Sequence, residues 1–555
     1  MTLKRLLAEI AAGRRAPLVA ALVALLASLP TLFTLPAMDR DEARFAEASA
    51  QMLESRDFTD ILFQDTPRYK KPVGVYWLQA LSVAALSSPE ARQVWAYRVP
   101  SVLGAMLAAA ACAWGALAFL EPPLAAMAGV LMASTTVLAA EATLATTDAA
   151  LCGTVTLAMA AMARTYLERR GGPPVGPWPR PLFWAALGAS ILLKGPIGPM
   201  VVGLAAAALS LWDRDGRWLA RLGWDWGLII LAAMVLPWAL AITVATDGGF
   251  WGVAVGGDLA PKLFGGQEGH GAPPGYFLLL SPILLFPAVL LLPAGLVAAW
   301  RARAEPGVRF AICWLAPAWI VFELVPTKLP HYTLPAFGAL AWLMAAALRV
   351  PLGAWPRRVG LALLAAVALG LAVAGAVAAA MFGGPWSWVW AALAAALLAA
   401  AAIAGGVLIL RRRAGLAALV GCGLGLLAHD AIAGALAPSL GQIWLSARVA
   451  QALDRATNGK PDENGPVAVA GYGEPSLVFA LGAPTELGEA SDAAEAIDEG
   501  RPAVVERAAE PAFESSLAGL HDKARAVGEV DGLDYSTGHR QWLRLYLPVQ
   551  AQGGG

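Results

Sequence analysis

The sequence is poor in charge for its length. Only 14% of its 555 residues are charged, whereas 58% are hydrophobic and the mean hydropathy is +0.61. Soluble globular proteins carry about a quarter charged residues, so this composition excludes an ordinary water-soluble enzyme. It also excludes a disordered chain. The 40 basic and 40 acidic residues cancel, which leaves no basic excess for binding nucleic acid.

Cysteine is scarce as well. The four cysteines, Cys112, Cys152, Cys313 and Cys422, lie singly in apolar runs and form no CxxC motif and no Cys/His cluster. This spacing excludes a disulfide framework and a structural zinc site of the usual type. We interpret these residues as small buried hydrophobes.

The net charge of zero is the sum of two unlike regions. Residues 439–555 contain 9 basic and 17 acidic residues, which leaves 31 basic and 23 acidic residues in 1–438. Residues 439–555 therefore carry a net charge of −8, and residues 1–438 carry a net charge of +8. We predict a transmembrane domain over residues 1–438 and a soluble domain over residues 439–555.

Apolar segments long enough to cross a bilayer recur throughout residues 1–438. About thirteen are predicted as membrane spans: 17–37, 98–120, 124–146, 149–167, 181–194, 196–212, 226–246, 276–300, 309–326, 331–349, 359–382, 386–410 and 415–437. Val73–Leu86 is shorter, and its Tyr76 and Trp77 suit the headgroup region. We expect it to be an interfacial helix within a first outer loop over residues 37–97.

The distribution of Lys and Arg supports this assignment. If Val73–Leu86 does not cross, the basic loops fall on the same side as Arg14 and Arg15, as the positive-inside rule requires. These loops are Arg164–Arg180, Asp213–Arg221, Arg301–Arg309, Arg349–Arg358 and Arg411–Arg413. The prediction is a multi-pass membrane protein with a cytoplasmic N-terminus and an extracytoplasmic C-terminal domain.

The C-terminal region has the pattern of a small α/β domain. Strands are expected at residues 466–470, 502–506 and 541–547, and helices near Ser476–Leu481, Asp492–Glu499 and Pro511–Ala518.

The first outer loop is dense in charged residues. Asp41 and Arg44 are three residues apart and would share one face of a helix; a solvated, salt-bridged helix start is the alternative interpretation. Arg68, Lys70 and Lys71 follow in one short run. Headgroup anchoring would explain them, but an outer basic cluster runs against the positive-inside trend. An anionic ligand such as phosphate is therefore favoured.

Further polar residues lie where spans meet the outer face. Asp148 follows Thr147 at a span boundary, where it would either cap a helix or serve in proton abstraction. Lys194 lies between two apolar segments, which is unusual for an ionisable residue. The remaining candidates for the substrate pocket are Glu42, Tyr69, His270, Tyr276, Lys328, His331 and Tyr332. A lone loop histidine or an interface lysine is more often structural.

Taken in order, these motifs resemble those of the lipid A aminoarabinose transferases, bacterial relatives of the protein O-mannosyltransferases. The resemblance covers nearly the whole chain. Its motifs are Asp41-Glu42-Ala-Arg44-Phe45-Ala-Glu47, Arg68-Tyr69-Lys70-Lys71-Pro72, Thr147-Asp148, Leu193-Lys194-Gly195-Pro196, His270-x-x-Pro273-x-x-Tyr276-Phe277, Lys328-Leu-Pro-His331-Tyr332, Gly473-Glu474-Pro475-Ser476 and Asp534-Tyr535-Ser536.

The resemblance implies a GT-C fold with its active site on the periplasmic side. The donor would be a sugar on a polyprenyl phosphate, usually undecaprenyl phosphate, and the acceptor lipid A or another envelope glycan. Asp41 and Asp148 would be the catalytic acidic residues. Arg44 and Lys71 would bind the donor phosphate, and we add Lys70 and Arg68 to this set. Transfer would invert the anomeric centre, and a monomer surrounded by membrane lipids is expected.

One position departs from the family pattern. The family places Glu directly before the Lys-Pro pair, where this chain has Lys70. That Glu and the loop histidine are associated with a metal in the family, so zinc is not predicted here. No cofactor is assigned; a divalent metal bound by His270 is the open alternative. Lys70 would instead meet an acidic sugar, a phosphate or an acidic acceptor.

Three other functions are considered. A protein O-glycosyltransferase using the same kind of donor is the alternative within the class. A lipid transporter or flippase would show paired repeats and charges at mid-membrane, whereas the charges here collect at one face. A purely structural scaffold would leave the clustered Asp41, Arg44, Lys71 and Asp148 unexplained.

Overall fold

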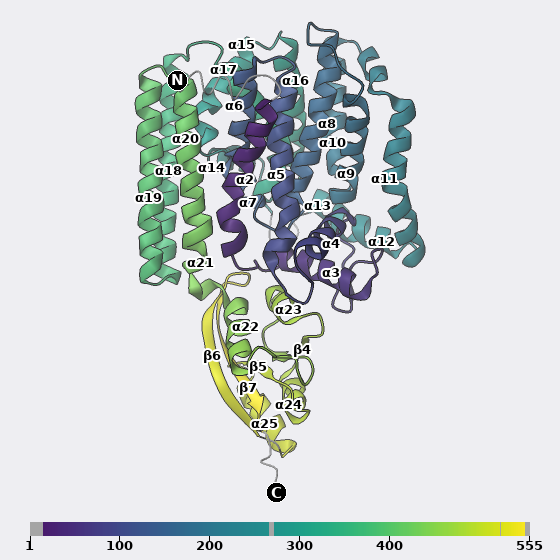
Figure 1. Ribbon diagram of the computed structural model, residues 1–555, viewed down its shortest axis with the longest axis vertical. Helices are drawn as coiled ribbons and strands as arrows, with labels where there is room; N and C mark the ends of the chain where they lie inside the picture. Colours follow the sequence, from purple (N-terminus) through teal and green to yellow (C-terminus); the bar gives the residue numbers. More distant parts are fainter. Residues whose placement is uncertain (1–14, 266–270, 522, 550–555) are drawn as a thin grey trace.

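A bundle of upright helices makes up most of the molecule (Figure 1). The computed structural model describes residues 15–265, 271–521 and 523–549. The helices of the bundle are α2 (Ala16–Thr34), α5 (Val94–Ala116), α6 (Pro122–Ala133), α7 (Thr136–Glu141), α8 (Asp148–Glu168), α9 (Pro179–Lys194), α10 (Ile197–Asp213), α11 (Trp224–Ala245), α14 (Tyr276–Leu284), α15 (Leu292–Arg301), α16 (Pro306–Leu324), α17 (Phe337–Ala347), α18 (Ala354–Phe382), α19 (Pro385–Leu410), α20 (Ala414–His429) and α21 (Ala437–Ser439). Shorter helical segments connect them: η2 (Arg217–Leu222), α12 (Gly249–Trp251), η3 (Gly252–Leu259), α13 (Ala260–Phe264), η4 (Ala288–Leu291), η5 (Pro330–Ala336) and η6 (Asp430–Leu436).

The predicted spans all fall on helical segments, but several are broken or short. Within the described residues, eight helices are long and apolar enough to cross a membrane, and a bent pair formed by α14 with η4 and α15 raises this to nine. The bend in that pair is 114°. The multi-pass membrane architecture is confirmed, whereas the number of thirteen crossings remains a prediction, because α6, α9, α10 and α17 are shorter than a full span.

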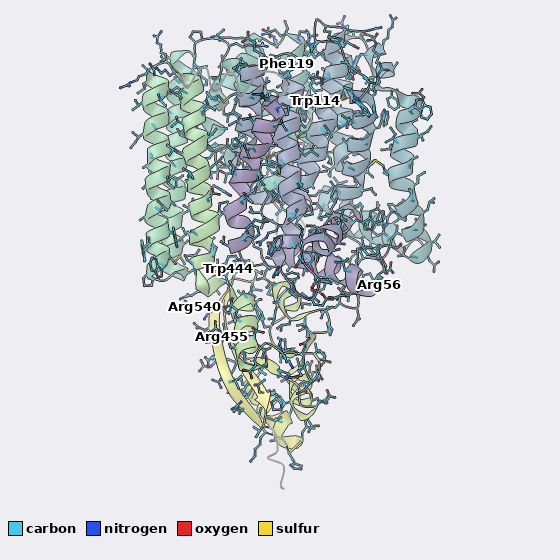
Figure 2. The ribbon with its side chains drawn as sticks, viewed as in Figure 1. Arg56, Trp114, Phe119, Trp444, Arg455 and Arg540 are labelled. Atoms are coloured by element: carbon cyan, nitrogen blue, oxygen red, sulfur yellow. The ribbon has the colours of Figure 1, made fainter. Side chains whose placement is uncertain are left out.

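The two ends of the bundle differ in character. Ion pairs link four of the predicted basic loops at one end: Arg170–Asp213 (2.8 Å), Arg221–Glu168 (3.0 Å), Arg349–Glu305 (2.6 Å) and Arg309–Asp213. Arg349 also donates to the carbonyl oxygen of Phe119, which Figure 2 shows at the end away from the C-terminal domain. Trp444 and Arg540 lie at the opposite, domain-proximal end (Figure 2).

The first loop forms a compact layer at the domain-proximal end. It contains α3 (Asp41–Ser55), the two-stranded pair β1 (Leu62–Phe63) and β2 (Thr66–Pro67), and α4 (Gly74–Leu86). Helix α4, the predicted interfacial helix, has 13 residues and lies beside α3 at this end (Figure 1).

Close helix contacts set the positions of the site-bearing segments. A side chain at Gly104 of α5 or Gly153 of α8 would approach the facing backbone to 2.5 Å, so these glycines allow the two helices to pack backbone to backbone. A Cβ at Gly74 of α4 would likewise meet the carbonyl oxygen of Leu192 at 2.7 Å. Helix α4 is thus held against the end of α9.

The C-terminal domain is a mixed sheet with helices, as predicted. Its five described strands have the order β4-β3-β5-β7-β6, with β3 parallel to β4 and β5 and with β7 antiparallel to β5 and β6. The elements are η7 (Gly441–Ile443), α22 (Leu445–Ala456), β3 (Ala468–Ala470), α23 (Pro475–Leu481), β4 (Glu486–Gly488), α24 (Ala490–Asp498), β5 (Ala503–Glu506), α25 (Glu510–Gly519), β6 (Ala524–Asp534) and β7 (His539–Pro548). The pattern did not predict β4 or β6, because both strands carry many exposed or half-buried polar residues instead of a clear alternation.

Candidate active site

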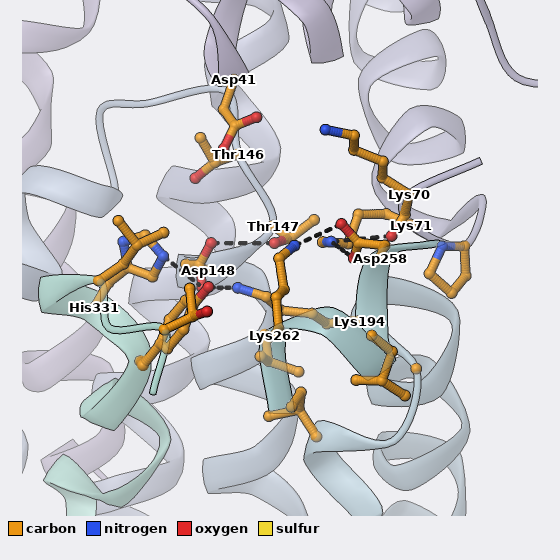
Figure 3. A pocket seen from close by; sticks show the side chains of 18 of the residues that line it. Asp41, Lys70, Lys71, Thr146, Thr147, Asp148, Lys194, Asp258, Lys262 and His331 are labelled. Atoms are coloured by element: carbon orange, nitrogen blue, oxygen red, sulfur yellow. Dashed lines mark hydrogen bonds and ion pairs between the residues drawn. The ribbon is translucent and has the colours of Figure 1, made fainter. Parts of the chain in front are cut away.

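A cavity of about 460 Å³ opens at the domain-proximal end of the bundle. Nine of the predicted site residues line it: Asp41, Glu42, Arg68, Lys70, Lys71, Asp148, Lys194, His331 and Tyr332. These residues come from five segments that are far apart in the sequence, and Figure 3 shows side chains from these segments converging on the cavity. The apolar part of the lining comes from residues such as Val255, Leu259 and Phe322.

Asp41 is the carboxylate most open to the cavity. It is the first residue of α3, and its side chain is 67% exposed. The guanidinium Nη2 of Arg68 lies 3.4 Å from its Oδ1, and Arg68 is itself packed over the ring of Phe45 at 4.8 Å. Withdrawal from bulk water raises the pKa of Asp41, but the positive charges of Arg68, Lys71, Arg44 and Lys194 outweigh this and hold it below its usual range. Asp41 is therefore ionised at neutral pH.

Lys71 lies in a second charge cluster. Its Nζ donates to Asp258 Oδ2 at 3.0 Å, and Lys262 donates to Oδ1 of the same carboxylate at 2.6 Å (Figure 3). Burial lowers the pKa of Lys71 to about 8, although Asp258 opposes this shift. Burial raises the pKa of Asp258, and Lys71 and Lys262 bring it below the usual value.

Asp148 belongs to a third, buried network. It begins α8, where the helix dipole favours an anion. Its Oδ1 accepts a hydrogen bond from Lys194 Nζ at 2.6 Å and lies 3.6 Å from His331 Nε2. His331 Nδ1 is in turn 3.0 Å from Glu141 Oε1. Thr147 donates to the other Asp148 oxygen at 3.1 Å.

Glu141, Asp148 and His331 offer ligand atoms of the kind that bind divalent metals. One atom from each lies within 4.8 Å of the others. The ammonium of Lys194, however, is 2.6 Å from Asp148 and would be repelled by a dication. This set fits a hydrogen-bonded charge network better than a metal centre. His270, the predicted metal ligand, lies outside the described residues.

Glu42 lines the cavity but its carboxylate faces away into the protein. It forms a bidentate pair with Arg98, with both N···O distances 2.8 Å, and accepts the backbone N–H groups of Met38 and Ala145. All of its oxygens are used, so its role in this geometry is to fix the start of α3.

Four predicted residues lie away from the described cavity lining. Arg44 is one helical turn after Asp41 and acts on it through its charge. The ring of Tyr69 packs on Phe250 at 5.6 Å, and that of Tyr276 on Phe277 at 5.1 Å. Lys328 donates to the carbonyl oxygen of Val325.

Sequence reasoning missed three residues of the site: Glu141, Asp258 and Lys262. Asp258 and Lys262 are four residues apart, a spacing that pairs charges on a helix, and this signal was available. The position of Glu141 beside His331 depends on η5 folding back against α7, which no local pattern indicates.

Comparison with known proteins supports the fold. Residues 16–250 match the profile of the dolichyl-phosphate-mannose-protein mannosyltransferase family. The fold is similar to the crystal structure of ArnT from Cupriavidus metallidurans bound to undecaprenyl phosphate, with a TM-score of 0.76, 20% identity and coverage of 95% of this chain and 97% of that one. The chain has the GT-C fold. The resemblance inferred from the motifs is thus confirmed.

Sequence relatives with assigned activities are more similar in sequence than the ArnT structure but match a shorter part of the chain. The undecaprenyl phosphate-α-4-amino-4-deoxy-L-arabinose arabinosyl transferase 1 of Pseudomonas fluorescens is 29% identical over 309 residues, which cover 55% of this chain and 54% of the relative. The corresponding transferase of Pseudomonas paraeruginosa is 30% identical over 316 residues, with 56% and 55% coverage. The matches span about half the length of these curated relatives.

Proposed function

We propose that this GT-C protein is a glycosyltransferase that moves one sugar from a polyprenyl phosphate, such as undecaprenyl phosphate, to lipid A or another cell-envelope acceptor. One observation carries the proposal: an ionised, cavity-exposed Asp41 lies beside Arg68, with Lys71 in the same cavity. A base for the acceptor and cations for a phosphate leaving group are the two requirements of this reaction.

The chemistry is a single displacement. Asp41 orients the acceptor hydroxyl or phosphate and accepts a proton from a hydroxyl acceptor. The acceptor oxygen forms a bond to the anomeric carbon while the bond from that carbon to the phosphate oxygen breaks. The electron pair leaves with polyprenyl phosphate, whose negative charge is stabilised by Lys71, Arg68 and Lys70 of the cavity lining. Arg44 lies outside this lining and contributes only its positive charge at a distance. Because the leaving group is a stabilised anion, cations serve it better than a general acid.

The buried network has a supporting role in this scheme. Asp148 is paired with Lys194 and His331, so its carboxylate is less available for proton abstraction than that of Asp41. We assign it to holding Lys194 in the cavity wall, where the ammonium adds to the positive field around the phosphate.

The relatives support the choice of donor. The curated relatives are named as undecaprenyl phosphate-aminoarabinose transferases, and the ArnT structure that matches 95% of this chain contains undecaprenyl phosphate. By extension, this chain lies in the bacterial inner membrane with its basic loops in the cytoplasm and its C-terminal domain in the periplasm, and it acts as a monomer.

Mass spectrometry of lipid A and envelope glycans from a deletion strain tests the proposal. We expect one sugar mass to disappear and to return with the wild-type gene or with the control variant Asp498→Asn, which changes an exposed aspartate of α24. Asp41→Asn should not restore it. Unchanged glycans in the deletion strain would contradict the proposal.

The same strains separate the alternatives. Loss of sugar from secreted peptides with unchanged lipid A would identify a protein O-glycosyltransferase. Uptake of labelled lipid by proteoliposomes without any glycosyl transfer would favour a flippase instead.

A further inference from the structure

The C-terminal domain contacts the segment that carries Asp41. The backbone N–H of Asp39, two residues before Asp41, donates to the hydroxyl oxygen of Tyr535 at 2.6 Å. The Oδ1 of Asp39 accepts the backbone N–H of Ser476 at 3.2 Å. Both partners belong to the domain after residue 439. Asp39 is therefore held through its backbone and its side chain at once.

These two partners are held rigidly within the C-terminal domain. Tyr535 lies in the turn between β6 and β7, where Oδ1 of Asp534 accepts the N–H groups of Ser536 (2.9 Å) and Thr537 (3.3 Å). A carboxylate that bonds the backbone two residues ahead stabilises such a turn. The hydroxyl of Ser476 donates to that of Ser446 at 2.6 Å, in a buried position.

The membrane domain holds the same segment from its other side. The N–H of Met38 donates to Glu42 at 2.8 Å, and Glu42 is fixed by its buried pair with Arg98. Arg98 also donates to the carbonyl oxygen of Leu35 at 2.6 Å. Residues 38 and 39 are thus anchored in different domains, immediately before the catalytic helix begins.

The backbone between Asp39, held by the C-terminal domain, and Glu42, held by Arg98 of the membrane domain, is strained. Arg40 has φ of 64° and ψ of −93°, a combination that residues with a side chain rarely adopt. Such a conformation persists only where the surroundings over-determine it, and it concentrates at functional sites. The Arg40 side chain is exposed and lies 3.8 Å from Glu474, a contact too long to impose this backbone conformation. The anchors on either side impose the turn that directs Asp41 toward the cavity.

A second contact joins the C-terminal domain to the segment that leads into Arg68, Lys70 and Lys71. Gln64 Nε2 donates to the carbonyl oxygens of Ala483 (3.0 Å) and Thr485 (2.6 Å). Gln64 lies in the turn between β1 and β2, and β2 leads directly into Arg68. The domain therefore contacts both segments from which Asp41 and Arg68 enter the cavity.

We propose that the C-terminal domain is part of the catalytic apparatus and that Tyr535 acts as a positioning residue. Tyr535 holds Asp39 in place, and the strained backbone at Arg40 then directs Asp41 toward Arg68. This inference rests on the proposed function, since it requires Asp41 to be a reacting residue. It predicts that a single hydroxyl outside the membrane domain controls the turnover rate.

The variant Tyr535→Phe tests this directly, because it removes the acceptor for the Asp39 N–H and keeps the ring. Tyr546→Phe is the matched control: its hydroxyl bonds Glu510 at 3.0 Å within the same domain. The assay uses the full chain in detergent, undecaprenyl phosphate-linked sugars extracted from the deletion strain, and the acceptor that regains mass in the complemented strain. We expect Tyr535→Phe to lower kcat about 10- to 100-fold, the effect of misplacing a reacting group by a fraction of an ångström to one ångström.

Two readouts separate positioning from general instability. The donor KM should change little, and the acid limb of the kcat/KM profile should move to higher pH, because Asp41 loses the nearby charge that lowers its pKa. Hydrogen exchange in a peptide spanning residues 36–44 should accelerate in Tyr535→Phe and not in Tyr546→Phe. This exchange measurement does not depend on any enzymatic activity.

Replacing Arg40 by glycine provides a rescue test. Glycine adopts positive φ without strain, so Arg40→Gly should return much of the lost kcat to Tyr535→Phe. Wild-type kcat and pH profile in Tyr535→Phe would overturn the inference, and so would an equal loss in Tyr546→Phe or no rescue by Arg40→Gly. If instead the wild-type chain transfers no sugar while the exchange difference is present, it is the proposed function that fails.

Discussion

Asp41 and Asp148 line the same cavity and differ sharply in their surroundings. The Asp41 side chain is 67% exposed and lies 3.4 Å from Arg68, whereas the Asp148 side chain is 9% exposed and accepts a hydrogen bond from Lys194 at 2.6 Å. An open carboxylate can approach a substrate without losing an existing partner. A buried, paired one cannot, because removing its partner leaves an uncompensated charge. We therefore expect the two predicted catalytic acids to have different roles.

The largest effect is expected for Asp41→Asn. The loss of the base should lower kcat by about 10²- to 10⁴-fold, the usual contribution of general base catalysis, while the thermal midpoint in detergent stays that of the wild type. Activity and unfolding are measured on the same preparation, with Asp498→Asn as the control. A large fall in the thermal midpoint would contradict this, because it would show that Asp41 stabilises the fold as Asp148 does.

For Asp148→Asn we expect activity and stability to fall together. Lys194 would remain buried without its anion, at a cost of about 3–5 kcal/mol. The double variant Asp148→Leu/Lys194→Leu removes both charges and should recover most of the unfolding free energy while remaining inactive. If the single variant is as stable as the wild type, the contrast with Asp41 disappears.

Lys71 and Asp258 form a second buried pair, with side chains 18% and 8% exposed. Because the pKa of Lys71 is lowered to about 8, its charge is present below that pH and is lost above it. We expect kcat/KM for the donor to fall as the pH rises through about 8. In Asp258→Asn this limb should move to lower pH, because the anion that favours the charged lysine is gone. A limb that does not move would exclude Lys71 as its origin.

The smallest effect concerns Glu474, an acid in the C-terminal domain whose Oε2 is buried without a hydrogen-bond partner among the described residues. Burial, reinforced by Asp39 and Asp534, raises the pKa of Glu474 to about 7. The folded state then binds the proton more tightly than the unfolded state, so stability decreases as the pH rises from about 4.5 to 7. Glu474→Gln should flatten this part of the stability curve and raise the thermal midpoint above pH 7. An unchanged curve would contradict the assignment.

Much of the fold could be predicted because membrane helices and charged loops leave strong local signals. An interfacial helix at Val73–Leu86 was predicted from its length, its Tyr76 and Trp77 and the side on which the basic loops fall, and the structure places α4 at the domain-proximal end (Figure 1). The sequence did not indicate where helices within the predicted membrane spans are interrupted. The segment 331–349 begins with the 3₁₀ segment η5 before α17, and η5 brings His331 to Asp148.

For the site, residue types were more predictable than partners. Asp41, Lys71, Asp148 and Lys194 were identified as candidates, and all four line one cavity. Their pairing was not predictable, because Asp258 reaches Lys71 across 187 positions of sequence. Ion pairs of this kind depend on which helices are neighbours.

By itself, the sequence determined that this is a membrane protein with a small C-terminal α/β domain, and that acidic and basic residues gather on one face. Hydrophobicity and charge are properties of short segments, so they can be read locally. Only the tertiary structure decided that Asp41 is exposed to the cavity while Asp148 is buried in an ion pair, and that Tyr535 contacts the segment leading into Asp41. These features depend on the approach of distant segments and on the water that this approach excludes, because burial determines how strongly one charge acts on another.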